Sequence, residues 1–500
     1  MLPCPRWQGL SPLKGDGESR SASSAHLDYQ PGNFIARRRA EYGMRAEDIE
    51  YLKSIVSPER VSVKKADLDA HSQDESFHEP HPPEAVVWPE SAEEISAILR
   101  YANQRRIPVT PWSGGSSLEG NPIPVRGGIV LALYNLNQIL EIKEEDLQVR
   151  VQPGVVYDDL NKRLARYGLF FPPAPASSDV ATIGGMVANN SSGMHAVKYG
   201  TTKDYVLRLK VVLPTGEITT VGSSAVKSSS GYDLVRLFVG SEGTLGVVTE
   251  ITLRLRLVPE RMAALAVFPS MRQAAQAIFE INRYGPTPAA IELMDPNLVG
   301  LVNRYKNLNL AEAPTLVMEF HGTPAGIQEE VELTKETCLA NGCTDFRSGM
   351  SPQERDRLWE GRREAHNAVK HLNPDYIVTI GDIAVPISKY PEAVEKAYEI
   401  AEKYNIRVYT FGHAGDGNLH TEILARRDDE DERRRAELVN EEIVRYAIGV
   451  GGTATGEHGV GIGKRKFMRL EHGESLEVMR RIKRLLDPNG IMNPGKIFEE

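Results

Sequence analysis

Two short segments near the C-terminus combine residue types that bind metal ions and transfer protons. The first segment reads FGHAGDGNLH and carries His413 and His420 on either side of the tetrapeptide GDGN. Because this tetrapeptide is typical of a reverse turn, we expect a hairpin whose turn is centred on Asp416 and Gly417. His413 would then lie opposite His420 with Cβ atoms about 5 Å apart, a spacing that suits two imidazole ligands of one metal ion.

The second segment, TGEHGVG, places Glu457 and His458 side by side in a glycine-rich loop. Two histidines and one carboxylate leave a coordination position open, which is typical of a catalytic site for zinc or a similar ion. The pattern therefore predicts that His413, His420 and Glu457 hold a divalent metal, with zinc as the first choice. Glu422 shares the expected strand face of His420. It is open to three interpretations: a group behind the ligands, a further ligand, or an exposed strand carboxylate.

The first half of the chain contains four glycine-rich loops, each next to an expected strand. The loops are SGGSS at 113–117, TIGG at 182–185, NNSSG at 189–193 and GSEGTLG at 240–246. Glycine lets the backbone approach an anion closely, and serine and threonine hydroxyls add hydrogen-bond donors. The loops together indicate a cofactor that carries phosphate groups. The chain has no GxxxxGK[ST] loop, and no GxGxxG sequence opens a helix, so a Rossmann nicotinamide site is not supported.

The spacing of apolar residues predicts an α+β chain. A strand at 85–88, a helix opened by a capping box at Ser91 and Glu94, and a strand at 107–110 follow one another. Further strands are expected at 129–133, 149–151, 207–213 and 247–257. Beyond residue 259 the pattern predicts helices at 271–282, 327–339, 391–404 and 475–486, and strands at 315–320, 377–380 and 408–411.

Charge and cysteine content exclude several classes of protein. The 59 Lys and Arg residues against 68 Asp and Glu residues give a net charge of −9, which disfavours a nucleic-acid partner. No apolar run approaches the ~18 residues that argue for a membrane span. The three cysteines, Cys4, Cys338 and Cys343, are too few for a disulfide framework or an intrinsic iron–sulfur cluster. Redox chemistry would therefore need another cofactor, in a reducing compartment.

Five other histidines receive no function from the sequence. His71, His78 and His81 occupy a polar, proline-rich stretch and are expected to be exposed. His366 and His371 fall on a helix or at its end. An isolated histidine is more often a surface or core residue than a ligand, so these five are set aside.

Residues 82–257 resemble the FAD-binding domain of the vanillyl-alcohol-oxidase (PCMH-type) flavoproteins. The matching pieces are PWSGGSSLEG, PPAPASSDVATIGGMVANNSSG, KYG and FVGSEGTLGVVTEITLRL. The resemblance implies that FAD contacts Pro111, Ser113, Gly114, Gly115, Ser116, Ser117, Thr182, Gly184, Gly185, Gly193, Glu242, Gly243 and Val248. Some members of that family attach the flavin through a histidine at the place of Ser116. Serine cannot form that bond, so the resemblance implies non-covalent FAD.

Residues 258–500 resemble the C-terminal domain of FAD-linked D-2-hydroxyacid dehydrogenases, including D-lactate dehydrogenase and the flavin subunit of glycolate oxidase. The matching motifs are LWEGR, GHAGDGNLH, GEHGVG and NPGKIF. The resemblance makes His413, His420 and Glu457 the metal ligands and His458 the base. It also implies that Arg362 pairs with the substrate carboxylate, with Arg363 as the alternative, and that Asn493 approaches the flavin. Relatives selective for a five-carbon diacid carry a lysine at the place of Ile380, which argues against a second substrate carboxylate.

Together these observations predict four segments and one reaction. A flexible extension (1–45) precedes an FAD domain (46–257, core 82–257), a ferredoxin-like substrate or cap domain (258–455), and a C-terminal segment (456–500) that closes the site over the flavin. The expected reaction is oxidation of a small D-2-hydroxy acid, D-lactate first and glycolate second, to the 2-oxo acid. Electrons would pass to an acceptor protein or a quinone-linked carrier. The expected location is cytoplasmic, with membrane association only through a partner.

Four alternatives remain open at this point. They are a D-2-hydroxyglutarate-type dehydrogenase, an alkyl-transferring flavoprotein related to the ether-lipid synthase, an FAD-binding subunit of a larger oxidase, and a structural zinc protein. The intact His413, His420, Glu457 and His458 favour an enzyme over a scaffold. The open coordination position argues against structural zinc. The sequence does not choose between a homodimer and a hetero-oligomer.

Overall fold

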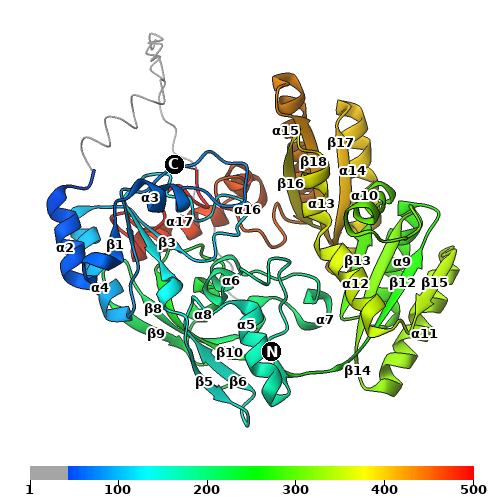
Figure 1. Cartoon of the computed structure of the whole chain (residues 1–500), viewed down its shortest axis with the longest axis horizontal. Helices are drawn as coiled ribbons and strands as arrows, with labels where there is room; N and C mark the ends of the chain where they lie inside the picture. The colour runs from blue at the N-terminus through cyan, green and yellow to red at the C-terminus, as the bar shows by residue number, and fades with distance from the viewer. Residues whose placement is uncertain (1–42, 500) are drawn as a thin grey trace, which may run out of the picture. The chain divides into compact units, whose positions relative to one another are not determined.

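The computed structural model describes residues 43–499 (Figure 1). Most of the predicted N-terminal extension, including Cys4, lies outside the described residues. Among those that are described, helices and strands mix throughout the chain, which agrees with the predicted α+β class. No described helix is both long and apolar enough to cross a membrane.

The first sheet of the N-terminal half carries the SGGSS loop at the end of one strand. Its order is β1-β2-β4-β3, with β2, β4 and β3 parallel. The bounds are β1 Val61–Ser62, β2 Ala85–Val87, β3 Val109–Trp112 and β4 Ile129–Ala132. Helix α4 (Ala92–Arg105) begins where the Ser91 hydroxyl accepts the Glu94 amide. The Glu94 carboxylate binds Arg60 and the Glu90 amide instead of closing the predicted capping box.

A second, antiparallel sheet supports the other glycine loops. Its order is β5-β6-β10-β8-β9. The bounds are β5 Ile139–Lys143, β6 Gln148–Val151, β8 Val206–Val212, β9 Ile218–Gly222 and β10 Val247–Arg254. The TIGG sequence is the start of the short helix α6 (Ile183–Asn189), with Thr182 as its N-cap, and the helix packs Ile183, Met186 and Val187 into the core of this sheet. The two sheets therefore hold the loops that were assigned to the cofactor.

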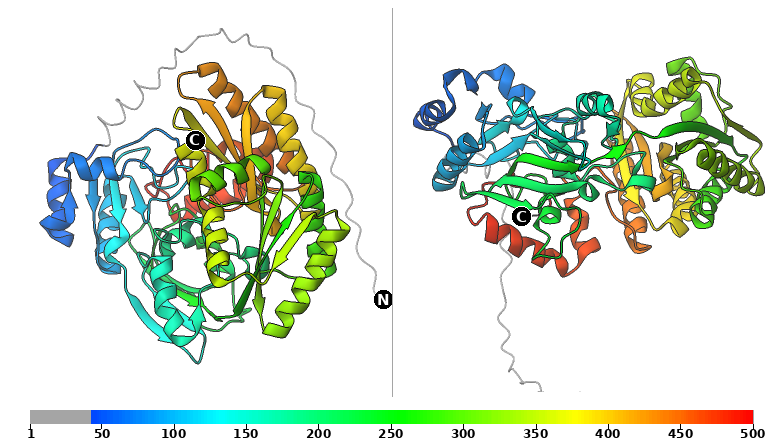
Figure 2. Two further views of the ribbon diagram at one scale, coloured as in Figure 1. Left: turned by 45° about the vertical axis from the view of Figure 1, so that its right-hand side comes forward. Right: turned by 90° about the horizontal axis from the view of Figure 1, so that it is seen from below.

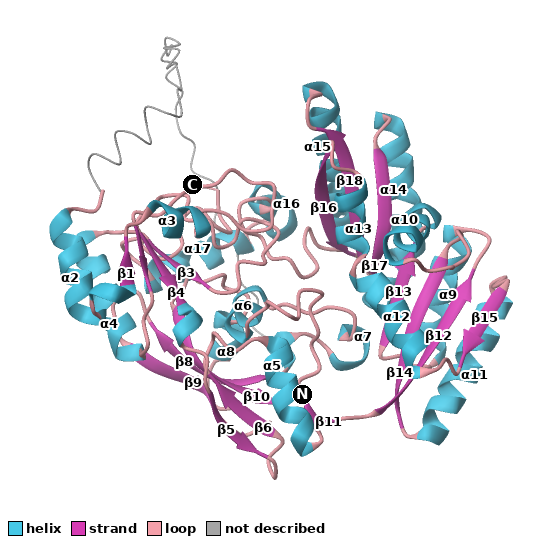
Figure 3. Cartoon of the chain, viewed as in Figure 1, coloured by secondary structure: helices cyan, strands magenta, loops and turns pink. Residues whose placement is uncertain are grey.

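The C-terminal half is built on a seven-stranded sheet with helices on both faces (Figure 3). The order is β15-β12-β14-β13-β17-β18-β16, all antiparallel. The strands are β12 Glu260–Val267, β13 Ala290–Met294, β14 Thr315–Gly322, β15 Asp345–Ser348, β16 Tyr376–Ala384, β17 Arg407–His413 and β18 Asn418–Arg426.

Seven helices cover this sheet, four on one face and three on the other. The first face carries α9 Met271–Tyr284, α11 Pro324–Ala340, α14 Tyr390–Tyr404 and α15 Glu430–Gly449. The other carries α10 Pro296–Lys306, α12 Pro352–Arg363 and α13 Ala365–Leu372. Phe411 packs on the sheet face that α12 and α13 cover. Alternate residues of a strand share a face, so the His413 side chain, two residues later, points to the same side.

After α15 the chain returns to the N-terminal half. Helix α17 (Ser475–Leu486) lies beside that half in both views of Figure 2. The Lys483 ammonium donates to the Thr244 carbonyl at 2.7 Å, and Met492 forms a parallel bridge with Val109 at the end of the first sheet. These contacts place Asn493 next to the loop that contains Glu242, where its amide donates to the Glu242 carbonyl at 2.7 Å.

The hairpin that carries the two histidines differs in register from the sequence prediction. His420 pairs with Phe411, and His413 pairs across the other side with Glu292 on β13. The reason is the connection, which is a 3₁₀ turn at Ala414–Asp416 followed by Gly417 in the left-handed region, rather than a two-residue turn. Because the register shifts by an even number of residues, His413 and His420 still share one face.

Gly417→Ala is expected to lower the free energy of unfolding by about 3 kcal/mol. Gly417 has φ of +75°, and a Cβ there would lie 2.2 Å from the Val385 carbonyl oxygen, so backbone strain and a clash add together. Gly451→Ala is the matched control, because Gly451 has φ of +85° and no atom within 4 Å of an added Cβ. Urea unfolding should give the control a cost of only about 1–2 kcal/mol. Equal costs would show that the Val385 contact is not limiting.

Candidate active site

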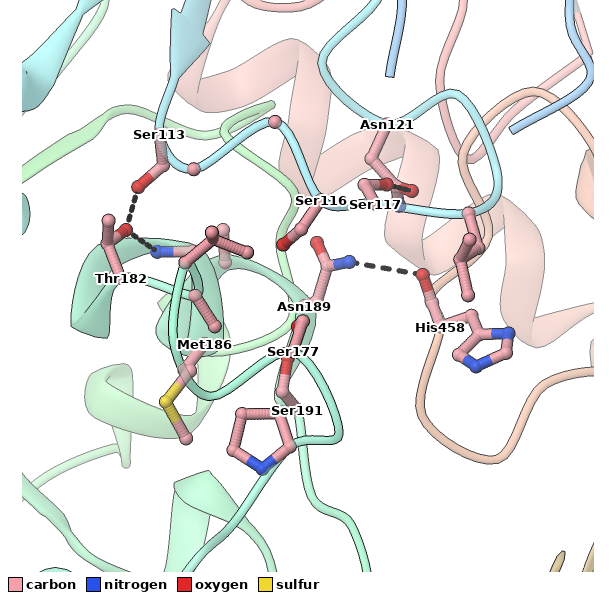
Figure 4. A pocket seen from close by; sticks show the side chains of 18 of the residues that line it. Ser113, Ser116, Ser117, Asn121, Ser177, Thr182, Met186, Asn189, Ser191 and His458 are labelled. Carbon is pink, nitrogen blue, oxygen red and sulfur yellow. Dashed lines mark hydrogen bonds between the residues drawn. The ribbon is translucent and has the colours of Figure 1, made fainter. Parts of the chain in front are cut away.

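One cavity of about 800 Å³ joins the N-terminal and C-terminal halves. Its walls come from the glycine loops on one side and from the seven-stranded sheet with α12 and α13 on the other. Figure 4 shows Ser113 and Thr182 at one end of this region and His458 at the other, with Asn189 between them. The Asn189 amide donates to the His458 carbonyl at 3.1 Å. The glycine loops and His458 thus face one space.

The glycine loops line the cavity with backbone, because side chains have no room there. An added Cβ would lie 2.5 Å from the Val180 carbonyl at Gly114 and 2.5 Å from a Pro153 side-chain atom at Gly184. Thr182 Oγ1 accepts the Gly185 amide at 3.2 Å and bonds to the Ser113 hydroxyl, which ties the two loops together. Such an exposed, hydroxyl-rich backbone fits the phosphate groups of a dinucleotide.

Nearly all residues assigned to FAD line this cavity. They are Pro111, Ser113, Gly114, Gly115, Ser116, Ser117, Thr182, Gly184, Gly185, Glu242, Gly243, Val248 and Asn493. Gly193 is the exception, since it does not belong to the cavity wall. Its φ is +119°, and a Cβ would lie 2.0 Å from the Ala174 carbonyl, so a tight backbone approach explains this glycine without a cofactor contact.

Glu242 joins the cofactor domain to the C-terminal loop. The buried carboxylate accepts the Val460 amide at 2.7 Å, the Gly461 amide at 2.9 Å and the Asn121 side-chain amide at 2.8 Å. Burial raises the pKa of Glu242, while these three donors oppose that rise. The carboxylate therefore positions the loop that follows His458 in addition to lining the cavity.

His413, His420 and Glu457 converge as the sequence predicts for metal ligands. Glu457 Oε1 lies 3.1 Å from His413 Nε2 and 3.4 Å from His420 Nε2. The two imidazole rings are perpendicular, with centroids 5.2 Å apart. One atom from each residue lies within 4.8 Å of the others, a distance range in which a single ion between them could reach all three.

Two further carboxylates orient these histidines. Glu292 Oε1 lies 2.7 Å from His413 Nδ1, and Asp382 Oδ1 lies 3.6 Å from His420 Nδ1. Burial alone would lower the pKa of His413, but Glu292 and Glu457 raise it well above its usual value. The carboxylates thus stabilise positive charge at this position, and a hydrogen bond to the far ring nitrogen, which His413 makes with Glu292, is typical of metal-binding histidines. On both grounds the residues fit a divalent cation.

Asp382 positions the loop that carries His458. Its Oδ2 accepts the amides of Gly456, Glu457 and His458 at 2.9–3.0 Å. The His458 ring stacks on His420 with centroids 5.2 Å apart, and its Nδ1 makes no hydrogen bond to any described residue. Burial lowers the pKa of His458 although Asp382 opposes this. A neutral imidazole on the cavity wall is the form that can accept a proton.

Arg362 lies in the cavity wall near these ligands. Its guanidinium is buried, pairs with Glu292, and lies over the Phe411 ring at 4.6 Å from the centroid. The Nε atom of Arg362 makes no hydrogen bond to any described residue. The neighbouring Arg363 also reaches the cavity. Arg362 can therefore hold an anionic group while Glu292 fixes its orientation.

Sequence reasoning missed several residues that the tertiary structure adds. Glu292 and Asp382 stand on strands far from the histidine motifs, and only strand pairing brings them there. His366 lines the cavity although no function was assigned to it. The sequence DIAVP at 382–386 carried a signal for Asp382, because a lone aspartate in an apolar strand is unusual. Glu292, in the similar AIELM strand, carried the same signal.

A second buried group of ionisable residues lies outside the cavity. His195 from the N-terminal half meets Glu319 and His321 on β14, with Glu319 hydrogen-bonded to His321 and 3.8 Å from His195. Tyr199 adds a bond to His321 at 3.0 Å, and Arg261 lies 3.9 Å from Glu319. The Arg261 guanidinium already balances the charge of the Glu319 carboxylate. We therefore interpret this group as a polar contact between the two halves, with its hydrogen bonds made within the group.

The prediction that His71, His78 and His81 are exposed is wrong, because His71 is buried and both His78 and His81 are half-buried. His71 was expected to be exposed, yet only 8% of its surface is accessible. Its ring packs edge-on against Trp112, with centroids 5.1 Å apart, and its Nδ1 bonds to the Asp67 carbonyl at 2.8 Å. The polar composition of the stretch gave no indication that Trp88 and Trp112 would pack around His71.

Comparisons with known proteins define the class. Residues 83–222 match the FAD binding domain family, and residues 258–497 match the family of FAD linked oxidases, C-terminal domain. The 4-ethylphenol oxidase from Gulosibacter chungangensis, solved with isoeugenol, superposes with a TM-score of 0.75 over 91% of this chain and 98% of that one. At 19% identity this likeness shows the fold alone. The protein is an FAD-linked oxidoreductase.

Closer relatives define the family. The probable mitochondrial D-lactate dehydrogenase of Danio rerio is 40% identical over 456 residues, which cover 90% of this chain and 91% of that protein. Glycolate oxidase subunit GlcD of Bacillus subtilis (strain 168) is 38% identical over 453 residues, covering 90% and 96%. The chain belongs to the family of FAD-linked oxidases that contains these D-lactate dehydrogenases and GlcD subunits.

Proposed function

We propose that this enzyme oxidises a short D-2-hydroxy acid to the 2-oxo acid at the cavity described above. Among 2-hydroxy acids without a further hydroxyl group, D-lactate ranks first and glycolate second, because relatives are named D-lactate dehydrogenase and glycolate oxidase subunit. The observation that carries the proposal is the meeting of His413, His420, Glu457 and His458 in the wall of the same cavity as the glycine loops.

The residues divide the reaction between them. Arg362 binds the substrate carboxylate through a planar guanidinium that Glu292 holds in place. His458 accepts the proton of the 2-hydroxyl group. A divalent cation held by His413, His420 and Glu457 would supply Lewis-acid stabilisation of the deprotonated oxygen. FAD held by the glycine loops would supply the acceptor for the hydride that leaves C2.

The remaining features follow from the same assignment. Serine at position 116 supports non-covalent FAD, and Ile380 in the cavity wall supports a substrate without a distal carboxylate. Reoxidation would use an acceptor protein or a quinone-linked carrier. One relative is named a D-lactate dehydrogenase and the other a subunit of glycolate oxidase. The proposed activity is therefore compatible with a stand-alone enzyme and with a subunit of a larger oxidase.

Anaerobic titration of the FAD-loaded protein tests the proposal. D-lactate and glycolate are expected to bleach the flavin absorbance at ~450 nm, because reduced flavin lacks that band. L-lactate should leave the band unchanged. A full panel of D- and L-2-hydroxy acids that leaves the oxidised spectrum intact would overturn the proposed function.

A further inference from the structure

The cavity contains an imidazole–carboxylate pair that the proposed reaction does not use. His366 on α13 lines the cavity, and its Nδ1 lies 2.8 Å from Glu422 Oε1. Glu422 is fully buried, and its second oxygen makes no hydrogen bond to any described residue. A buried carboxylate with a single hydrogen-bond partner is costly in free energy. Here it fixes the orientation of the His366 ring.

The hydrogen bond decides which ring atom of His366 is available. The Nδ1 atom of His366 is engaged by the Glu422 carboxylate at 2.8 Å. The Nε2 atom is then the one left for a group inside the cavity. The His366 side chain keeps 25% of its surface accessible, whereas Glu422 keeps none. The pair thus presents one polar atom to the substrate space.

Strand geometry places this pair next to the candidate metal ligands. Glu422 follows His420 by two residues on β18, so both side chains share a face and are separated by about 7 Å along the strand. On the neighbouring strand, Asp382 pairs with His420 and Ile380 pairs with Glu422. Arg362 lies four residues before His366. If a three-carbon acid binds between Arg362 and His420, its C3 substituent is the part that can meet the His366 ring, since all three residues line the same cavity.

The surrounding charges favour a neutral hydroxyl group at that place. Ile380 offers no charge, and Lys370 lies 3.7 Å from Glu75, which offsets its positive charge. Arg363 and Glu364, which also line the cavity, carry opposite charges. A second substrate carboxylate would face the buried charge of Glu422, whereas a hydroxyl group can exchange a hydrogen bond with an imidazole nitrogen at no electrostatic cost.

We infer that His366, oriented by Glu422, binds a hydroxyl group on C3 of the substrate, so that the preferred acids are short D-2,3-dihydroxy acids. This inference rests on the proposed function. The C3 hydroxyl keeps all its bonds: only the C2 hydroxyl loses a proton and only C2 loses a hydride to FAD. The product is a 3-hydroxy-2-oxo acid.

Flavin reduction by D-glycerate and D-lactate tests the inference, because the two acids differ only in the C3 hydroxyl. In anaerobic stopped-flow experiments, the second-order rate constant for D-glycerate is expected to exceed that for D-lactate by about 10- to 100-fold. In His366→Phe this ratio should fall at least tenfold. Glu422→Gln keeps an oxygen that can accept the Nδ1 proton and should retain more of the preference than Glu422→Leu.

His371→Phe is the matched control, since His371 lies on the same helix and outside the cavity wall. Its ratio should equal that of the unmodified enzyme. Equal rate constants for the two acids in the unmodified enzyme, or an unchanged ratio in His366→Phe, would overturn the inference while the proposed function stands. If neither acid nor any other 2-hydroxy acid reduces the flavin, the proposed function fails and the inference fails with it.

Discussion

His458→Ala is expected to slow flavin reduction by the 2-hydroxy acid about 10³-fold while FAD stays bound. The His458 ring lies on the cavity wall, stacked on His420, and burial keeps its pKa below the usual value. Its removal takes away the acceptor for the hydroxyl proton. Stopped-flow absorbance under anaerobic conditions measures the rate constant, and the flavin spectrum of the purified variant measures FAD content.

The backbone contacts of this position make the variant a clean test. Asp382 and Asn189 form hydrogen bonds with the backbone amide and carbonyl of His458, which alanine retains, so we expect the loop to keep its place. His472→Ala is the control, because that histidine belongs to the C-terminal segment but not to the cavity wall. A rate constant within tenfold of the unmodified enzyme would remove His458 from the base role. His366, the other imidazole without a ligand role, would then become the candidate base.

Glu457→Gln is expected to abolish both metal binding and turnover. Glu457 Oε1 is the atom that approaches both His413 and His420, and the neighbouring histidines lower the pKa of its carboxyl group well below the usual value. An amide oxygen is uncharged and a much weaker ligand. We expect the bound metal to fall from one equivalent to less than about a tenth, and turnover to fall by about 10³-fold.

Elemental analysis of the purified protein measures the metal, and dialysis against a chelator should reproduce the loss of turnover in the unmodified enzyme. Glu319→Gln is the matched control, since Glu319 is also a buried carboxylate beside two histidines but lies outside the cavity. This control should keep one equivalent of metal. Full activity of metal-free protein would contradict the ligand assignment, and loss of metal only in Glu319→Gln would move the ion to the other group.

Local patterns predicted the α+β class and most helices and strands. The last helix, 475–486, has the predicted bounds, because its apolar period and its Asp-Pro-Asn-Gly end are local signals. Helix α9 and strand β10 also fall where the patterns place them. The turn after His413 differs from the prediction, because a 3₁₀ turn and a two-residue turn share the same preferences for glycine and aspartate.

The site residues divide in the same way. His413, His420, Glu457 and His458 could be singled out because metal and proton chemistry restricts residue type and spacing within a few positions. Glu292 lies more than a hundred residues from His413, and His366 lies 56 residues from Glu422. Nothing in a local window connects such pairs, because they meet only through strand pairing and helix packing.

The amino-acid sequence by itself therefore indicated the chemistry that short motifs carry: glycine loops for a phosphate-bearing cofactor, and two histidines with a glutamate as candidate ligands of a cation. Folding was needed for everything that depends on long-range contact. It brought Asp382 into contact with the backbone of the His458 loop and paired Glu292 with Arg362. It also brought His366, which the sequence left unassigned, into the wall of the cavity. The physical reason is that backbone propensities act over a few residues, whereas the geometry of a site is set by which distant surfaces become buried against one another.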